Sequence, residues 1–218
     1  MDNYTLSRDR AQSYFLNFDQ TELIQKWDLS HDDTALHLSF FGDPYSICRK
    51  TGAIHRHDGS EAGFEETLTI FDLLCHQDGS AAISGRFAPV NSLKGATKGA
   101  GVEKDFYRSA ADAFDRAPEQ FSAACHALGG APVPMGDIGF RFTMFRDLDV
   151  ILKFYHSDED FPASITILWD ENLLDFMFYE TVFYAAGFLL KAIQTQITSN
   201  LSAPADTSTV NCQLSTVN

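Results

Sequence analysis

The chain has 218 residues, of which 44% are hydrophobic, and this suffices for the core of one domain or at most two small ones. It carries 30 acidic against 16 basic side chains, and the formal net charge of -14 disfavours contact with nucleic-acid phosphates or an anionic membrane. We therefore expect one globular domain that has neither nucleic acid nor membrane among its partners.

The first third of the sequence predicts a helical segment followed by a small antiparallel sheet. Apolar residues recur at helical spacing over about residues 5–27, and the stretch 17–21 can break this helix. The run ALHLSFF then alternates apolar and polar side chains before a turn-forming GDP segment and the run YSICRK. This pattern predicts a three-stranded meander that ends near Arg56. A helix with an apolar stripe from Phe64 to Leu74 is expected to follow.

The middle of the chain changes character. Residues 77–101 are rich in Gly, Ser and Ala and lack clear periodicity, so they predict a long loop. A helical pattern resumes at Val102, and Pro118 suits the first turn of a second helix that Gly129-Gly130 ends. This segment is expected to form a helical hairpin.

The last third predicts a second meander and a long helix. Three alternating runs, IGFRFTMF, VILKFYH and ASITILWD, indicate strands within residues 138–170, and the apolar run after them indicates a largely buried helix. The strand positions expected to face the core share one parity: Phe140, Phe142, Met144, Val150, Leu152, Phe154, Ile165, Ile167 and Trp169.

These elements predict an α+β fold in which helices cover two three-stranded antiparallel meanders, joined in one sheet or stacked as two layers. The single domain is expected to span residues 1–199, and the polar residues 200–218 to form a flexible tail. The sequence has no signal-like start and no run of about 18 apolar residues, which predicts a cytoplasmic protein with reduced cysteines.

Short motifs in a fixed order carry a family resemblance. They are Gly136-Asp137 before Phe140-x-Phe142, Asp158-Glu159-x-Phe161-Pro162-Ala163, Ile167-Leu168-x-Asp170 and Glu180. With these motifs the chain resembles the domain-of-unknown-function family numbered 3786. The resemblance covers roughly residues 4–198. The resemblance implies a helper role in anaerobic one-carbon or cofactor metabolism. The chain has no Cys-x-x-Cys run for an iron–sulfur cluster, so a cluster-related role would need a separate partner.

The strand that ends at Trp169 leads into the first candidate site. Residues 147–180 hold nine acids and one Lys or Arg, and this negative field could attract a hard cation or an amine. Asp170 can instead be a helix cap. Glu180 lies in an aromatic run, where desolvation would raise its pKa unless Arg86 or Arg141 compensates. Together with Phe87, the residues Arg86, Asp170 and Glu180 are the predicted ligand-binding residues.

A second pattern offers a metal alternative, although no metal is the main expectation. His55 and His57 are two apart on a strand and therefore share a face, and Cys48 lies one hairpin away. No fourth ligand is indicated. Exposed strand-edge histidines and a small core cysteine explain the same residues.

We therefore predict a non-enzymatic accessory domain that binds a small molecule or a partner protein between the 77–101 loop and the second meander. The number of aromatic residues, 19 Phe and 7 Tyr, favours an aromatic-lined pocket there, bordered by Phe87, Phe178 or Tyr179. The alternatives are an enzyme that uses Asp170 and Glu180 with Arg86 or His156, and a metal-binding protein. The sequence identifies no cofactor.

Overall fold

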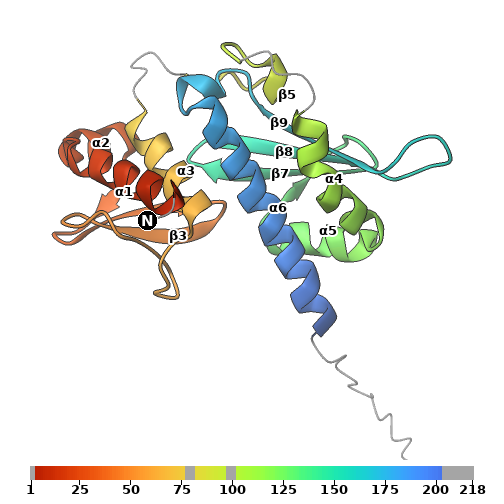
Figure 1. Cartoon of the computed structure of the whole chain (residues 1–218), viewed down its shortest axis with the longest axis horizontal. Helices are drawn as coiled ribbons and strands as arrows, with labels where there is room; N and C mark the ends of the chain where they lie inside the picture. The colour runs from red at the N-terminus through yellow and green to blue at the C-terminus, as the bar shows by residue number, and fades with distance from the viewer. Residues whose placement is uncertain (1–2, 77–81, 97–101, 203–218) are drawn as a thin grey trace, which may run out of the picture.

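Six helices and two antiparallel sheets make up the computed structural model, which describes residues 3–76, 82–96 and 102–202 (Figure 1). The helices are α1 (Asn3–Leu16), α2 (Gln20–Trp27), α3 (Phe64–Cys75), α4 (Val102–Asp115), α5 (Pro118–Ala127) and α6 (Tyr179–Ser202). The strands are β1 (Ser30–His31), β2 (Ala35–Phe40), β3 (Asp43–Cys48), β4 (Ile54–Arg56), β5 (Phe87–Pro89), β6 (Ala131–Pro132), β7 (Ile138–Phe145), β8 (Leu148–Tyr155) and β9 (Ser164–Asp170). The α+β class is confirmed.

The first sheet has the order β1-β2-β3-β4 and contains the predicted meander. Its register pairs Leu36 with Ile47 and Leu38 with Tyr45, so buried side chains meet on one face. The prediction of three strands is wrong by one, because β1 adds a short edge strand along β2. Two residues are too few to show an alternating pattern, which explains why β1 could not be predicted.

The expected break in the first helix is confirmed. It falls between α1 and α2, where the Asp19 carboxylate accepts the Thr21 N–H at 2.8 Å and caps α2. α2 ends at Asp28, whose φ of 46° is left-handed. α1, on the other side of the break, packs on α3.

A buried polar cluster joins α3 to the first sheet. The Glu66 side chain is 4% exposed and accepts hydrogen bonds from Tyr45 Oη at 2.6 Å and Arg56 Nε at 2.7 Å. It also accepts the Gly63 N–H at 2.6 Å, which caps the start of α3. All of these donors bind the Glu66 carboxylate, so its buried negative charge keeps a set of hydrogen-bond partners.

The second sheet has the order β5-β9-β8-β7-β6. All nine core positions predicted from parity are buried, and the cross-strand pairs Phe140–Leu152, Leu152–Ile167 and Val150–Trp169 place them on one face. The three-strand prediction again omits two short edges, β5 and β6. β5 lies inside the segment predicted as a loop, whose residues 77–81 and 97–101 are outside the described residues.

The two sheets are separate, so the arrangement in which both meanders join in one sheet is wrong. They are joined by a hydrogen bond from the Phe41 N–H to the Met144 carbonyl at 2.9 Å. The rings of Trp27 and Phe145 also meet across this seam, with their centroids 5.2 Å apart. The buried residues of both halves therefore form one continuous hydrophobic core.

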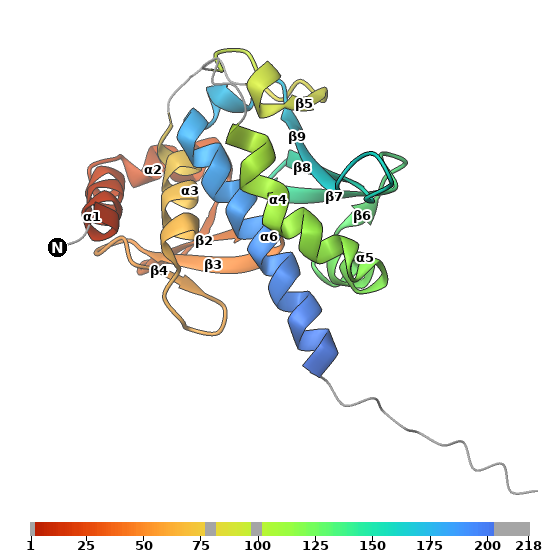
Figure 2. The ribbon, with the colours of Figure 1, turned by 45° about the vertical axis from the view of Figure 1, so that its right-hand side comes forward.

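The helices lie together on one side of the strands. Figure 2 shows α3, α6 and α4 side by side in front of them. α6 contacts α3 in one half and α5 in the other, and its Phe188 ring lies 5.1 Å from Phe40 of the first sheet. α6 is thus the element that covers the seam.

The ends of the domain bear on two further expectations. α6 continues to Ser202, beyond the predicted boundary at 199, and the rest of the expected tail lies outside the described residues. Within residues 3–76, 82–96 and 102–202, no helix combines the length and the apolar character needed to span a membrane.

Candidate functional site

The most polar cleft lies where α4 meets the β8–β9 connection. It has a volume of about 700 Å³. The lining residues come from α4, from the turn before β7, from the end of β8 and from the start of β9: Tyr107, Arg108, Asp137, His156, Asp158 and Phe161 are among them. Apolar side chains of Ala111, Pro162 and Ile165 complete the walls. We call this the His156 cleft.

Asp115 at the end of α4 holds the His156 ring in place. Its Oδ1 lies 2.8 Å from His156 Nδ1, and its Oδ2 accepts the Ser157 hydroxyl at 2.6 Å. These hydrogen bonds, the Ser157 one first, lower the pKa of the Asp115 carboxyl. Because an ionised carboxylate only accepts, Nδ1 carries a proton, and in the tautomer with its single proton there Nε2 is an acceptor.

The backbone of His156 is fixed from the other side by Asp137. The His156 N–H donates to Asp137 Oδ2 at 2.8 Å. Asp137 can reach it because Gly136 precedes it with a φ of 69°, and a Cβ at Gly136 would lie 2.5 Å from the Phe154 carbonyl oxygen. Glycine is therefore required at this turn.

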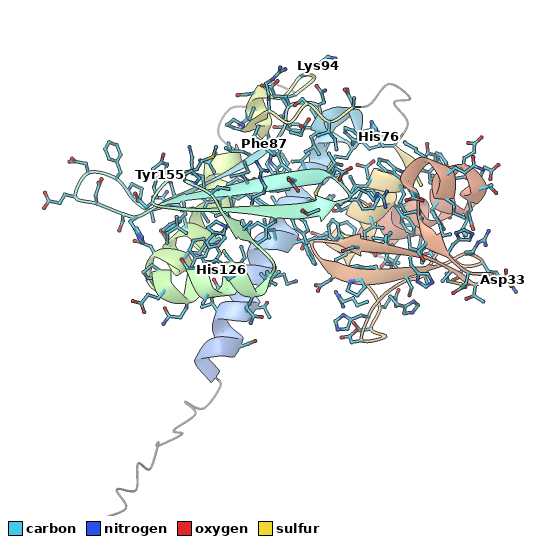
Figure 3. All side chains as sticks on the ribbon, turned by 180° about the vertical axis from the view of Figure 1, so that it is seen from behind. Asp33, His76, Phe87, Lys94, His126 and Tyr155 are labelled. Atoms are coloured by element: carbon cyan, nitrogen blue, oxygen red, sulfur yellow. The ribbon has the colours of Figure 1, made fainter. Side chains whose placement is uncertain are left out.

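Asp158 shapes the connection between β8 and β9. Its Oδ1 accepts the N–H groups of Asp160 at 2.9 Å and Phe161 at 2.7 Å, which closes a tight turn. The turn leaves Phe161 69% exposed at the cleft. Figure 3 shows this connection projecting beyond Tyr155, at the far end of the molecule from His76.

Three acceptor atoms at the His156 cleft have no hydrogen-bond partner within residues 3–76, 82–96 and 102–202. They are His156 Nε2, Asp137 Oδ1 and Asp158 Oδ2. Arg108 is the one Lys or Arg among the described lining residues, and its side chain is exposed. The cleft thus offers acceptors and negative charge beside apolar walls.

Asp170, the first of the predicted site residues, has a structural role. It is 1% exposed, and its carboxylate accepts the N–H groups of Ser84 at 3.0 Å, Gly85 at 2.8 Å and Asn172 at 2.9 Å. The Ser84 hydroxyl donates to it as well, at 3.0 Å. The carboxylate is therefore fully occupied in holding the segment before β5 against the end of β9.

Arg86 and Phe87 lie beside Asp170, on the same edge of the sheet. Arg86 Nε donates to Glu171 Oε2 at 2.7 Å, and the Arg86 side chain is 74% exposed. Phe87 is half-buried and lies across from Asp170 in the register, with the Arg141 guanidinium 5.2 Å from its ring centre. These contacts tie β5 to β9 and to its neighbours in the sheet.

Glu180 is not the desolvated acid that the sequence suggested. It is exposed on the first turn of α6, because its aromatic neighbours in the chain point to other sides of the helix. The expectation of burial is wrong for this residue. The acid whose pKa is raised, chiefly by burial, is Asp72 on α3, and the charge of Glu180 adds to that rise.

The predicted ligand-binding residues and the possible metal ligands lie outside three clefts of the described chain. Of Arg86, Phe87, Asp170 and Glu180, none lines the His156 cleft, the cleft beside Asp72 or the seam between the sheets. The described residues contain no group of three or more His, Cys, Asp or Glu placed to hold a metal ion, so Cys48, His55 and His57 do not form a ligand set.

Sequence reasoning named His156 only as a partner of Asp170 and missed Asp115. The two residues that pair are 41 positions apart and on different elements, so no local pattern joins them. A signal did exist: Gly136-Asp137 and the Asp158–Ala163 segment were quoted as motifs of the resemblance, and both border the His156 cleft.

The fold and its cleft define an α+β domain of two antiparallel sheets with an acid-rich, histidine-containing pocket on the second. Comparison with family models places the chain more narrowly. A model described as "Domain of unknown function (DUF3786)" matches residues 19–192, and the chain belongs to this family. Neither the curated proteins nor the solved structures contain a match to it.

Proposed function

We propose that this domain binds a small organic amine in the His156 cleft and acts as a ligand-binding accessory domain. The observation that carries the proposal is the set of three unoccupied acceptors, His156 Nε2, Asp137 Oδ1 and Asp158 Oδ2, on one cleft with apolar walls. A primary ammonium group has three N–H donors and no acceptor, which matches this set.

Charge supports the same ligand class. The two cleft aspartates each retain an oxygen for a ligand, and an ammonium group would neutralise part of the negative field around them. Tyr155 and Phe161 are exposed aromatic residues at the cleft, and aromatic faces attract organic cations. Arg108 repels a ligand that carries only positive charge, but its guanidinium can bind an anionic group at the far end of the same ligand.

The proposal is tested by titrating the protein with phenethylamine and with 3-phenylpropionate while recording backbone NMR spectra. Phenethylamine should shift the resonances of His156 and Phe161, and the carboxylate should not. Asp137→Asn should weaken amine binding by about tenfold or more, because one charge-assisted hydrogen bond is lost while the Asn carbonyl still accepts the His156 N–H.

Asp160→Asn is the matched control, since it removes the same charge at an exposed residue of the β8–β9 connection that does not line the cleft. Its affinity for phenethylamine should stay within about twofold of the parent, as expected for a screened surface charge. Equal binding of 3-phenylpropionate, or equal weakening by both substitutions, would contradict the proposal.

A second function is favoured by one specific contact. A carboxylate that fixes the Nδ1 proton of a histidine leaves Nε2 as a general base. If the protein is an enzyme, Asp115 and His156 are therefore the candidate catalytic pair in place of Asp170 and Glu180. Ser157 donates its hydroxyl to Asp115 and is therefore not aligned as a nucleophile for His156. If His156 is a reactive base, His156→Asn should remove most of the hydrolysis of p-nitrophenyl acetate by the protein, and an unchanged rate would end this alternative.

The helper role in anaerobic one-carbon or cofactor metabolism is kept as the broader setting of the proposal. It comes from the resemblance described in the sequence analysis, and a cleft suited to a small ligand is compatible with it. A primary amine found bound to the protein after purification from an anaerobic host would connect the cleft to that setting.

A further inference from the structure

A second cleft lies at the other end of the molecule, between α1, α3 and the start of α6. Its volume is about 630 Å³. Its walls are mainly apolar or aromatic and include Ala11, Tyr14, Leu68, Phe71 and Phe178. Phe178 is one of the residues expected from the sequence to border a ligand pocket. We call this the Asp72 cleft.

Asp72 on α3 and His76 just after it contribute the polar groups at the base of this cleft, and the Thr181 side chain, also in the lining, is hydrogen-bonded to Asp72. The Asp72 and His76 side chains are only 9% and 15% exposed. Asp72 Oδ2 accepts the Phe178 N–H at 2.8 Å. Asp72 Oδ1 lies 3.7 Å from His76 Nδ1, which is too far for a hydrogen bond.

His76 Nδ1 is buried and has no hydrogen-bond partner among the described residues. The ring is held by an edge-to-face contact with Phe178, with centroids 4.6 Å apart. The backbone carbonyl of His76 is fixed separately by Lys26 Nζ at 3.0 Å. A buried polar atom without a partner costs free energy, so this position favours a ligand that supplies the missing hydrogen bond.

We propose that the Asp72 cleft binds a small amphiphilic alcohol, with its hydroxyl group between Asp72 and His76. A hydroxyl both donates and accepts, so one group can donate to Asp72 Oδ1 and accept from a protonated Nδ1. The alkyl or aryl body then packs on Leu68, Phe71 and Phe178.

Charged relatives of the same size fit less well. A carboxylate placed beside Asp72 is repelled, and burying an ammonium group in an apolar cleft costs more desolvation than burying a hydroxyl. The charged or titratable groups near the cleft are Asp72, His76, Lys26 and Glu180, together with Arg10, which lies on α1 and lines the cleft. Because Arg10 is exposed and cationic, a fatty carboxylate is the competitor that the experiment must include.

The test titrates the whole protein with 1-heptanol, heptanoate and heptylamine and follows backbone NMR shifts. Heptanol should bind most tightly and shift the resonances of Phe71, His76 and Phe178. His76→Phe keeps an aromatic ring against Phe178 and removes Nδ1, and it should weaken heptanol binding by about fivefold, the effect of one hydrogen bond.

His126→Phe is the matched control. The His126 ring stands edge-to-face on Phe140 with centroids 4.9 Å apart, as His76 does on Phe178, and Figure 3 shows it far from His76. Heptanol affinity should be unchanged in this variant. Equal or tighter binding of heptanoate or heptylamine, or unchanged heptanol affinity in His76→Phe, would overturn the proposal.

A second variant covers the case in which His76→Phe fails to fold. Ala11→Phe places a large side chain in the cleft and leaves Asp72 and His76 intact. Heptanol should no longer bind to it. Binding at the parent affinity would show that the alcohol lies elsewhere and would refute the assignment of this cleft.

Discussion

Each of the two clefts contains an aspartate beside a histidine, and the two pairs differ in their surroundings. At the His156 cleft, the Asp115 oxygen and the imidazole nitrogen are 2.8 Å apart, and at the Asp72 cleft the same atoms of Asp72 and His76 are 3.7 Å apart. Asp115 is 20% exposed and hydrogen-bonded on both oxygens, so its pKa is lowered. Asp72 is buried, and desolvation raises its pKa.

The difference teaches that a residue pair does not define a site by itself. The exposed pair has one orientation and presents a free ring nitrogen, which suits charged ligands or proton transfer. The buried pair is left short of hydrogen bonds in an apolar space, which suits a neutral ligand. Predictions on acids in both environments can sharpen this contrast or break it.

The largest loss of stability is expected at Asp170, a buried acid whose carboxylate has a full set of hydrogen-bond donors. Asp170→Ala leaves the N–H groups of Ser84, Gly85 and Asn172 without their acceptor, and should lower the free energy of unfolding by about 3 kcal/mol. Urea unfolding measures the change. Glu171→Ala, which removes only the exposed pair with Arg86, should cost less than about 0.5 kcal/mol. Similar losses in both variants would contradict the assigned role.

Asp115→Ala should have the next largest effect. It removes the acceptor of the Ser157 hydroxyl and of the His156 ring, and should cost between about 1 and 2 kcal/mol at pH 7. Because the folded pKa of Asp115 is lowered, its contribution is complete above the usual value of 3.8 and is lost as pH falls through the folded pKa. The cost of the substitution should therefore shrink in acid.

The control for this experiment is Asp112→Ala, one turn earlier on α4, whose side chain makes no hydrogen bond or ion pair with the described residues. Thermal unfolding of both variants between pH 3 and pH 7 gives the comparison. A loss in Asp115→Ala that is independent of pH would show that the carboxylate charge plays no part.

Asp72→Asn should show the opposite dependence on pH. The raised pKa of Asp72 means that the folded state favours the neutral form, so the destabilising cost of ionisation is absent below 3.8 and grows as pH rises through the folded pKa. Asn keeps an acceptor for the Phe178 N–H and cannot ionise. The variant should thus be more stable than the parent by about 1 kcal/mol at pH 8 and equal to it near pH 3.5.

Neighbouring charges modify the size of this gain. His76 lowers the pKa of Asp72 and Glu180 raises it, so both remain unchanged in the experiment. Asp33→Asn, at an exposed residue of the first half, is the control and should show no such trend. A variant that loses stability as pH rises would mean that His76 holds Asp72 charged, and the two clefts would no longer differ.

The smallest effect is expected at Cys75, in the wall of the Asp72 cleft. Burial raises the pKa of its thiol to about 12, whereas hydrogen bonds from Thr51 lower the pKa of the Cys48 thiol. At pH 8, iodoacetamide should modify Cys48 while Cys75 stays essentially unmodified, because only the thiolate reacts. Peptide mapping by mass spectrometry measures both. Equal labelling would show that the cleft admits water freely.

The fold could be predicted from the sequence wherever a pattern is long enough to repeat. Alternation along β7, β8 and β9 predicted nine core positions of the second sheet and missed Phe145 and Leu148 beside the turn, and helical spacing placed α3 and α6. The short edges β1, β5 and β6 were missed because two or three residues show no period. β5 exists because Asp170 binds the residues before it, which is a long-range contact.

The sites could be predicted only in part, for the same reason. The acid-rich stretch 147–180 pointed to an amine or cation and supplies one wall of the His156 cleft, whereas Asp137 and the α4 residues of the lining lie outside it. Which acids matter depends on orientation: Asp170 turns toward backbone donors and Glu180 toward solvent. Asp115 and Asp72 gave no local signal, because each acquires its role from a residue on another element.

The position of α6 in the chain has a consequence for synthesis. It follows every other described element, and yet its Phe188 covers Phe40 of the first sheet while the same helix packs on α5. Until the ribosome has released α6, both halves carry an uncovered apolar surface, and such surface favours aggregation of a growing polypeptide. A circularly permuted gene that encodes α6 first would shorten that vulnerable interval.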